Sequence, residues 1–287
     1  MKKTAILFIT LIFFIQFGLF SQDKSLSQNI INSELKLDSL LKKLRKSKLN
    51  KDFIKYNNQF KSNLKLVLEN KDAFLYPFDS LKSTMSTLTS PDNKFRLFNW
   101  NVEMEDGVNK FYCYILKKDG KIIELKDRYR KIDNPELKSL SNKNWYGAVY
   151  YKIIKLKRGK YTLLGWNGDD AITTQKVIEV MNLKRKSVKF GETIFENKYS
   201  NLRKRRIVFK YANDAYVPVK YLETKKVKQI VFSHISPSTP QMKGHFEYYY
   251  PDLSYDNYTL ERGKWVYYTD SEVKNDKSVY TLAVAGW

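Results

Sequence analysis

The chain is poor in the residues that build disulfide frameworks and metal centres. Its 287 residues include one cysteine, Cys113, and two histidines, His234 and His245. A single cysteine excludes an intramolecular disulfide, and a chain of this length can bury a core without one. Cys113 lies in the strand-like run 111–115, so we expect a buried, unreactive thiol. No cysteine ligand set and no His-x-x-x-His spacing is present, so no metal and no other cofactor is predicted.

The sequence also lacks the motifs of several common enzyme classes. It contains no Gly-x-Ser-x-Gly elbow and no phosphate-binding Walker loop. These absences disfavour α/β-hydrolase and nucleotide-dependent chemistry. No DNA- or RNA-binding motif is present either, and a nucleic acid is not an expected partner.

The N-terminal segment has the composition of a secretory signal peptide. Lys2 and Lys3 precede an apolar run over 5–20, and Ser21 is a small residue at the expected cleavage point. We therefore predict that residues 1–21 are removed and that the protein is exported to the periplasm, the outer membrane or the exterior. The alternative is an uncleaved anchor. No later apolar run approaches the length of about 20 residues that a spanning helix needs, so no further span is expected.

Positive charge is abundant and unevenly distributed. The formal net charge is +22. Residues 183–230 hold fourteen Lys or Arg and four Asp or Glu, a net charge of +10, whereas 231–287 carry a net charge of −2. Such an excess attracts anionic partners over about 8 Å at physiological salt. The candidate partners are an anionic envelope glycan, a lipid headgroup or an acidic protein.

Residues 22–90 are predicted to form a helical N-terminal segment. Leu37, Leu40, Leu41 and Leu44 recur at spacings of three and four, which gives one apolar stripe. Asp52 is positioned to cap a second helix. The stripe could pack on the rest of the chain or dock a partner protein.

Residues 91–287 are predicted to form an antiparallel β domain. Asp106-Gly107 and Asp119-Gly120 divide 94–127 into a three-stranded meander, with positive φ expected at both residues of each pair. Further strands are expected at 145–156, 161–166, 176–183, 186–190, 204–211, 215–222, 227–235, 244–250, 256–261, 264–269 and, docked at the end, 279–287.

The resulting fold class is mainly β, and α+β overall because of the helical segment. Short connections between consecutive strands require antiparallel neighbours. About a dozen short strands in meander order are typical of a barrel, a sandwich or a propeller-like sheet. No fixed 40-residue repeat supports a true propeller.

Several stretches between residues 145 and 269 resemble a group of uncharacterised exported proteins of Bacteroidota. The resemblance implies a β-rich fold in the cell envelope and supplies no active site. It is carried by Leu163-Leu164-Gly165-Trp166-Asn167-Gly168, 176–180, Phe190-Gly191, Ile194-Phe195, 205–211, 230–237, Tyr250-Pro251-Asp252-Leu253-Ser254-Tyr255-Asp256 and Gly263-Lys264-Trp265.

The two histidines give one candidate catalytic cluster. His234 alternates with Ile230 and Phe232 on one expected strand, and His245 alternates with Glu247 on the next. If these strands pair, both histidines lie near one end of the sheet. They would lie close to Asp252 and Asp256, and a carboxylate could orient an imidazole as a general base or help to hold a metal. The competing interpretation is a pair of structural histidines.

The last third of the chain is rich in tyrosine, which gives a candidate binding surface. Tyr248, Tyr250 and Trp265 are the expected stacking residues for a sugar ring or a peptide. The favoured hypothesis is therefore a non-enzymatic binding or structural protein of the envelope. The alternative is a metal- or His/Asp-dependent hydrolase of envelope material.

Overall fold

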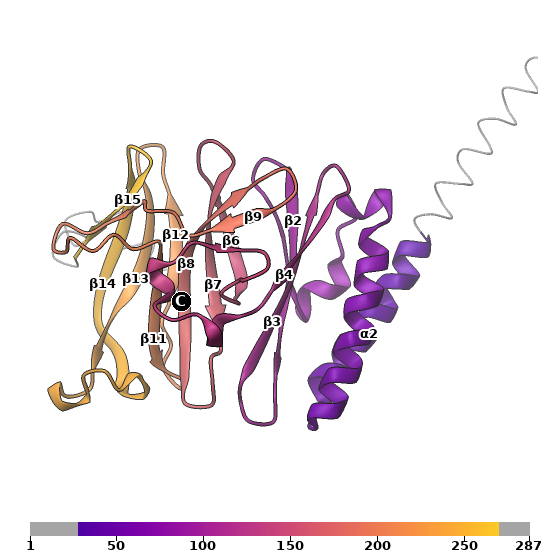
Figure 1. The fold of residues 1–287 in the computed structure, drawn as a ribbon, viewed down its shortest axis with the longest axis horizontal. Helices are drawn as coiled ribbons and strands as arrows, with labels where there is room; N and C mark the ends of the chain where they lie inside the picture. Colours follow the sequence, from indigo (N-terminus) through magenta and orange to yellow (C-terminus); the bar gives the residue numbers. More distant parts are fainter. Residues whose placement is uncertain (1–27, 270–287) are drawn as a thin grey trace, which may run out of the picture.

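A computed structural model describes residues 28–269 of the chain. The expected signal peptide and the expected strand at 279–287 lie outside these residues. The described part is mainly β, and its three sheets and one helical layer stand side by side along the long axis of the molecule (Figure 1). The sheets pack face to face, so the fold is a sandwich and not a closed barrel.

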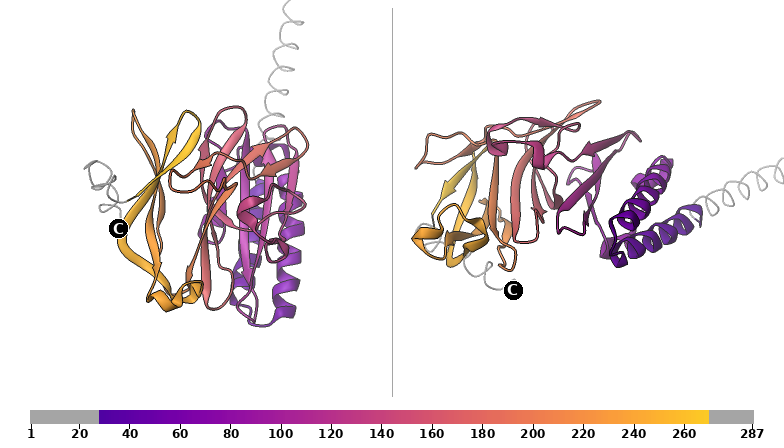
Figure 2. Two further views of the ribbon diagram at one scale, coloured as in Figure 1. Left: turned by 60° about the vertical axis from the view of Figure 1, so that its left-hand side comes forward. Right: turned by 60° about the horizontal axis from the view of Figure 1, so that its bottom comes forward.

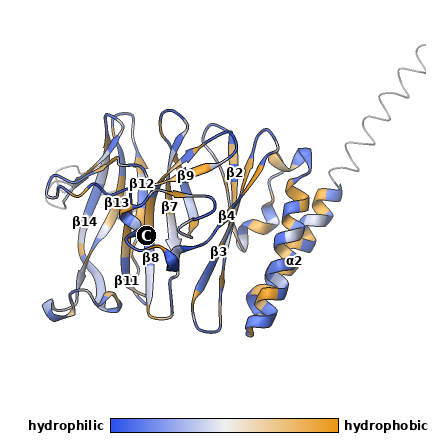
Figure 3. Ribbon diagram, in the orientation of Figure 1, coloured by the Kyte–Doolittle hydropathy of each residue, from blue (hydrophilic) through white to orange (hydrophobic). Residues whose placement is uncertain are grey.

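The helical layer packs against the first sheet. It contains a helix over 28–46 and α2 (Asn50–Leu68), followed by the 3-10 turns η1 (Lys71–Phe74) and η2 (Asp79–Ser83). The predicted leucine stripe is buried in this layer, together with Phe60 and Leu64 of α2. The stripe is therefore not available to dock a partner. α2 has one hydrophobic and one hydrophilic side, as its position at the surface of the sheet requires (Figure 3).

The predicted cap of α2 was wrong. The residue before the helix is Leu49, and Asp52 lies in the first turn without capping it. Asn50 instead exchanges two hydrogen bonds with Glu105. Its backbone N–H donates to Glu105 Oε1 at 2.5 Å, and its side-chain oxygen accepts from the Glu105 N–H at 3.1 Å. A tertiary contact with the turn after β2 thus holds this helix end.

The first sheet follows the strand order β1-β2-β3-β4. It confirms the predicted meander and adds one strand before it, so the helical segment ends before residue 86 and not at 90. The strands are β1 (Ser86–Thr89), β2 (Phe95–Glu103), β3 (Asn109–Lys117) and β4 (Ile122–Lys126).

The two Asp-Gly turns differ in conformation from the prediction. Gly107 and Gly120 have φ of +74° and +79°, but Asp106 and Asp119 are not among the residues with positive φ. Each turn therefore places only its glycine in the left-handed region, as in a longer hairpin loop that ends in a left-handed glycine.

The central and third sheets contain the remaining strands. The central sheet has the order β5-β9-β8-β7-β6. In addition, β11 pairs with residues 173–179 of β8, and β9 pairs with the following residues 181–183. The third sheet has the order β10-β15-β14-β13-β12. The central strands are β5 (Leu140–Ser141), β6 (Val149–Lys155), β7 (Lys160–Asn167), β8 (Thr173–Leu183), β9 (Val188–Phe190) and β11 (Arg206–Ala212). The third-sheet strands are β10 (Phe195–Glu196), β12 (Val219–Glu223), β13 (Lys228–Pro237), β14 (Tyr249–Glu261) and β15 (Lys264–Tyr268).

The first and central sheets are buried on both faces. Phe95 and Leu97 of β2 face the core shared with the central sheet, whereas Phe98 and Trp100 face the helices. Cys113 lies in the former core and is buried as predicted, and this burial raises the pKa of its thiol. Residues of β8 alternate in the same way between the cores on its two sides. The rotated views show these layers again (Figure 2).

The expected strand at 244–250 is largely absent. The connection between β13 and β14 contains two 3-10 turns, η5 (Pro240–Met242) and η6 (Phe246–Tyr248), and Gly244 has φ of +90°. Prolines without an N–H and a left-handed glycine do not suit a regular strand. The expected strand at 256–261 begins earlier, at Tyr249, and pairs with β13.

Candidate functional site

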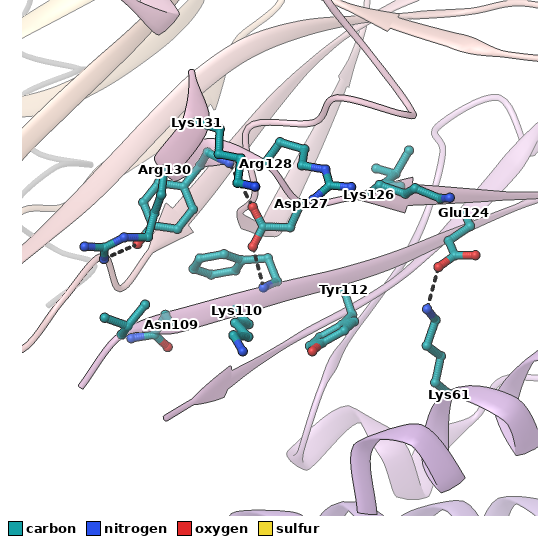
Figure 4. Close-up of a pocket in the computed structure, with 14 residues that line it drawn as sticks. Lys61, Asn109, Lys110, Tyr112, Glu124, Lys126, Asp127, Arg128, Arg130 and Lys131 are labelled. Carbon is teal, nitrogen blue, oxygen red and sulfur yellow. Dashed lines mark hydrogen bonds and ion pairs between the residues drawn. The ribbon is translucent and has the colours of Figure 1, made fainter. Parts of the chain in front are cut away.

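A cavity of about 580 Å³ lies where α2 approaches the ends of β3 and β4 (Figure 4). Its lining includes two acidic side chains, Glu124 and Asp127, and six cationic ones, which gives a net charge of +4. The cationic residues, which define the basic groove, are Lys61, Lys110, Lys126, Arg128, Arg130 and Lys131.

Only part of this positive charge is used inside the protein. Lys61 Nζ lies 2.6 Å from Glu124 Oε1. Arg130 Nη1 donates to the Tyr129 hydroxyl at 3.3 Å. The side chains of the other four cationic residues make no hydrogen bond or ion pair with any residue in 28–269. The groove therefore presents four cationic groups that are free to bind a ligand.

Asp127 is one of the residues that line the groove, and it binds two backbone N–H groups there. Its Oδ2 accepts from the Phe111 N–H at 2.9 Å, and its Oδ1 accepts from the Tyr129 N–H at 3.0 Å. Gly147 has φ of +79°, and a Cβ at that position would lie 2.7 Å from Asp127 Oδ1. Burial raises the pKa of Asp127 to about 6, against the opposing effect of the two N–H donors. Asp127 thus fixes the segment that carries Arg128, Arg130 and Lys131.

The groove was not predicted from the sequence. A local signal exists, because 126–131, which starts at the last residue of β4, holds four cationic residues in six positions. Residues from α2 and β3 join that run only through the fold. The predicted basic stretch 183–230 is partly neutralised within the protein. Four of its cations form ion pairs: Lys204 with Glu136, Arg206 with Glu179, Lys210 with Asp169 and Lys228 with Glu223.

Three of the four predicted catalytic candidates come together on the third sheet. His234 Nδ1 lies 2.7 Å from Asp256 Oδ2, and that oxygen also accepts from the Tyr267 hydroxyl at 2.6 Å. Asp256 is buried, whereas the His234 side chain is 44% exposed. His234 Nε2 faces Asp252 Oδ2 at 3.8 Å. The imidazole therefore has a buried carboxylate on one nitrogen and solvent access on the other side.

A β-bulge in β14 lies opposite His234. Ser233 pairs with Tyr255 and Ile235 pairs with Pro251, so residues 252–254 face the single residue His234. Leu253 in this bulge has φ of +69° and is 90% exposed. A branched apolar residue in that conformation is strained, and such strain is often found near functional sites.

His245 does not join this group. It precedes η6, and its Nδ1 lies 3.6 Å from Glu247 Oε1. The predicted alternation of His245 with Glu247 fails because 246–248 form a 3-10 turn. Within the described part of the chain, no three His, Cys, Asp or Glu side chains are arranged to hold a metal ion.

The predicted stacking residues have different positions. Tyr248 and Tyr250 are 44% and 37% exposed, and the Tyr250 hydroxyl donates to Asp214 Oδ1 at 3.2 Å. Trp265 is fully buried, and its Nε1 donates to Thr162 Oγ1 at 2.8 Å. Trp265 was therefore wrongly predicted as a ligand-binding residue, because it belongs to the core between the central and third sheets.

A buried ion pair in the central sheet is structural. Arg206 Nη2 lies 2.8 Å from Glu179 Oε2, and both side chains are fully buried. Glu179 also accepts from the Tyr150 hydroxyl, and Arg206 donates to the carbonyl oxygens of Pro135 and Lys138. All of these partners belong to the protein, so the pair joins β11, β8 and η4 (Pro135–Leu137) and offers nothing to a ligand.

No helix between residues 28 and 269 is long and apolar enough to cross a membrane. Comparisons with family models, curated proteins and solved structures give no match for this chain. The geometry of the basic groove and of the His234 group is therefore what bears on function.

Proposed function

We propose that this is an exported, non-enzymatic binding protein that holds an anionic ligand in the basic groove. One observation carries the proposal: Lys110, Lys126, Arg128 and Lys131 line an open cavity with no ion-pair partner among the described residues. Clefts lined by one sign of charge concentrate ligands of the opposite sign. The N-terminal composition supports export, because a basic start followed by an apolar run is typical of signal peptides.

The shape of the site favours an extended ligand. The groove is open, and its cations come from α2, β3, β4 and the segment after β4. An enclosed pocket would instead strip water from one small anion and surround it. Separated charges along a groove suit a chain that carries several anionic groups.

The test measures binding of two fluorescently labelled polyanions, polygalacturonate and poly-L-glutamate, by anisotropy at several salt concentrations. We expect Lys110→Ala with Arg128→Ala to weaken binding by about two- to thirty-fold, because each exposed ion pair contributes about 0.2–1 kcal/mol. Affinity of the unaltered protein should fall as salt rises.

A matched control separates the groove from general positive charge. Lys225→Ala with Lys226→Ala removes the same charge from the exposed turn between β12 and β13. This control should bind as the unaltered protein does. Absence of binding to both polymers, or equal losses in the two double variants, would refute the proposal.

A second candidate function rests on the 2.7 Å contact between His234 and Asp256. A carboxylate on Nδ1 orients the ring so that Nε2, which lies 3.8 Å from Asp252 Oδ2, can take a proton from a water molecule. The resulting hydroxide attacks an ester carbonyl. The proton then passes to the leaving alkoxide. If this hydrolase alternative is right, His234→Ala should slow p-nitrophenyl acetate hydrolysis at least about 100-fold. His245→Ala is the control and should not change the rate, and equal rates in all three proteins would exclude this activity.

A further inference from the structure

The basic groove is connected to the loops between the central and third sheets by a short series of contacts. The Tyr129 hydroxyl, in the wall of the groove, donates to the Asp169 carbonyl oxygen at 2.9 Å. Lys210 Nζ lies 2.8 Å from Asp169 Oδ2 and 6.0 Å from the centre of the Phe246 ring. The side chains of Tyr129 and Lys210, which both contact Asp169, therefore connect the groove with Phe246.

Several exposed aromatic rings lie on the loops near Phe246. We call Tyr216, Phe246, Tyr248 and Tyr250 the aromatic end, and they are 37–66% exposed. Tyr216 belongs to the connection between β11 and β12, and the other three lie between β13 and the start of β14. These connections lie at the same end as the turns before β3 and β8, which is the lower end in Figure 1.

Hydrogen bonds hold these loops together. The Asn213 N–H donates to the Ile172 carbonyl oxygen at 3.0 Å, and the Tyr250 hydroxyl donates to Asp214 Oδ1 at 3.2 Å. The aromatic rings therefore belong to loops that are hydrogen-bonded to one another. Lys210 contacts both Phe246 and Asp169, so it lies between the rings and the groove.

We infer that the ligand is an acidic polysaccharide, which places its anionic groups in the basic groove and its sugar rings on the aromatic end. This inference rests on the proposed function and adds the chemical class of the ligand. Aromatic rings with one exposed face bind flat, partly apolar groups and still offer a hydroxyl. The groove supplies the complementary charge.

A lipid headgroup and an acidic polypeptide each match only part of this surface. A lipid headgroup has the charge but no repeated flat ring. A polypeptide acidic enough for the groove consists mainly of Asp and Glu side chains, which have no flat apolar face. An acidic polysaccharide carries a charged group and a ring in each repeat, so one chain fits both parts.

The experiment compares polygalacturonate, poly-L-glutamate and neutral dextran on the same protein. We expect polygalacturonate to bind at least about ten-fold more tightly than poly-L-glutamate at equal salt, because stacking adds to charge. Tyr248→Ala with Tyr250→Ala should remove most of this difference and leave poly-L-glutamate binding unchanged. Tyr248→Leu with Tyr250→Leu keeps apolar volume and should give the same result.

Tyr199→Ala is the matched control, because Tyr199 is 65% exposed but packs beside Tyr267, away from these loops. It should bind all polymers normally. Equal affinity for the two acidic polymers, or no loss in either tyrosine variant, would overturn the inference while groove binding stands. Binding of dextran as tight as polygalacturonate would also overturn it, and binding of neither acidic polymer would remove the proposed function itself.

Discussion

At the scale of single residues, the same side-chain type has different roles in different surroundings. Asp127 is half-buried and accepts two backbone N–H groups in the wall of the groove. Asp256 is buried and accepts from His234 and Tyr267. Neither role follows from the local sequence alone, since Asp127 needs the Phe111 N–H and Asp256 needs His234 and Tyr267, all from other strands.

Asp127 gives a pH prediction. Its pKa is raised to about 6 in the folded protein from an ordinary value of 3.8. Between these two values the folded chain keeps a proton that the unfolded chain has lost. The contribution of Asp127 to the free energy of unfolding is therefore largest below about pH 4 and falls by about 3 kcal/mol in total as the pH rises through about 6.

Urea unfolding of the unaltered protein and of Asp127→Asn at pH 4.5 and pH 7 measures this effect. The stability difference, unaltered protein minus variant, should be smaller at pH 7, because only the unaltered protein titrates at this position. Other titrating groups cancel in the comparison. A difference that does not change with pH, or that grows towards pH 7, would contradict the assignment.

At the scale of elements, α2 illustrates how a helix is fixed by one face. Phe60 packs edge-on against Trp100 of β2 at 5.0 Å between ring centres, and the Trp100 Nε1–H donates to Asn57 Oδ1 at 2.8 Å. Leu64, one turn further on, is fully buried, whereas Leu66 is 66% exposed. The helix therefore owes its position to packing on the first sheet.

Leu64→Ala should lower the free energy of unfolding by about 2–5 kcal/mol, because it leaves a cavity between α2 and the first sheet. Leu66→Ala removes the same atoms two residues away and should change stability by less than about 0.5 kcal/mol. Thermal or urea unfolding of both variants checks this pair. Similar losses in the two variants would show that the helix does not pack on the sheet as described.

At the scale of the whole molecule, the layered arrangement decides where charge reaches solvent. The helical layer covers one face of the first sheet, and the basic groove lies beside α2 at the ends of β3 and β4 (Figure 4). Ion pairs in 183–230 lower the free charge of the most basic stretch. Net charge along the sequence is therefore a poor guide to the position of an anion-binding surface.

The sequence by itself determined the strand-rich fold class, the helical start, the meander at 94–127 and the burial of Cys113. These features depend on local turn chemistry and on hydrophobic spacing, both of which can be seen along the chain. It also named His234, Asp252 and Asp256, because all three lie on β13 and β14, which pair directly.

Only the tertiary structure decided that the sheets stack into a sandwich, that His245 leaves the histidine group and that Trp265 is core. It alone assembled the basic groove from α2, β3, β4 and 126–131. The physical reason is that the face covered by each sheet, and the partner of each charge, depend on contacts between residues far apart in the chain. Hydrophobic spacing shows that a residue is buried, but not which layer buries it.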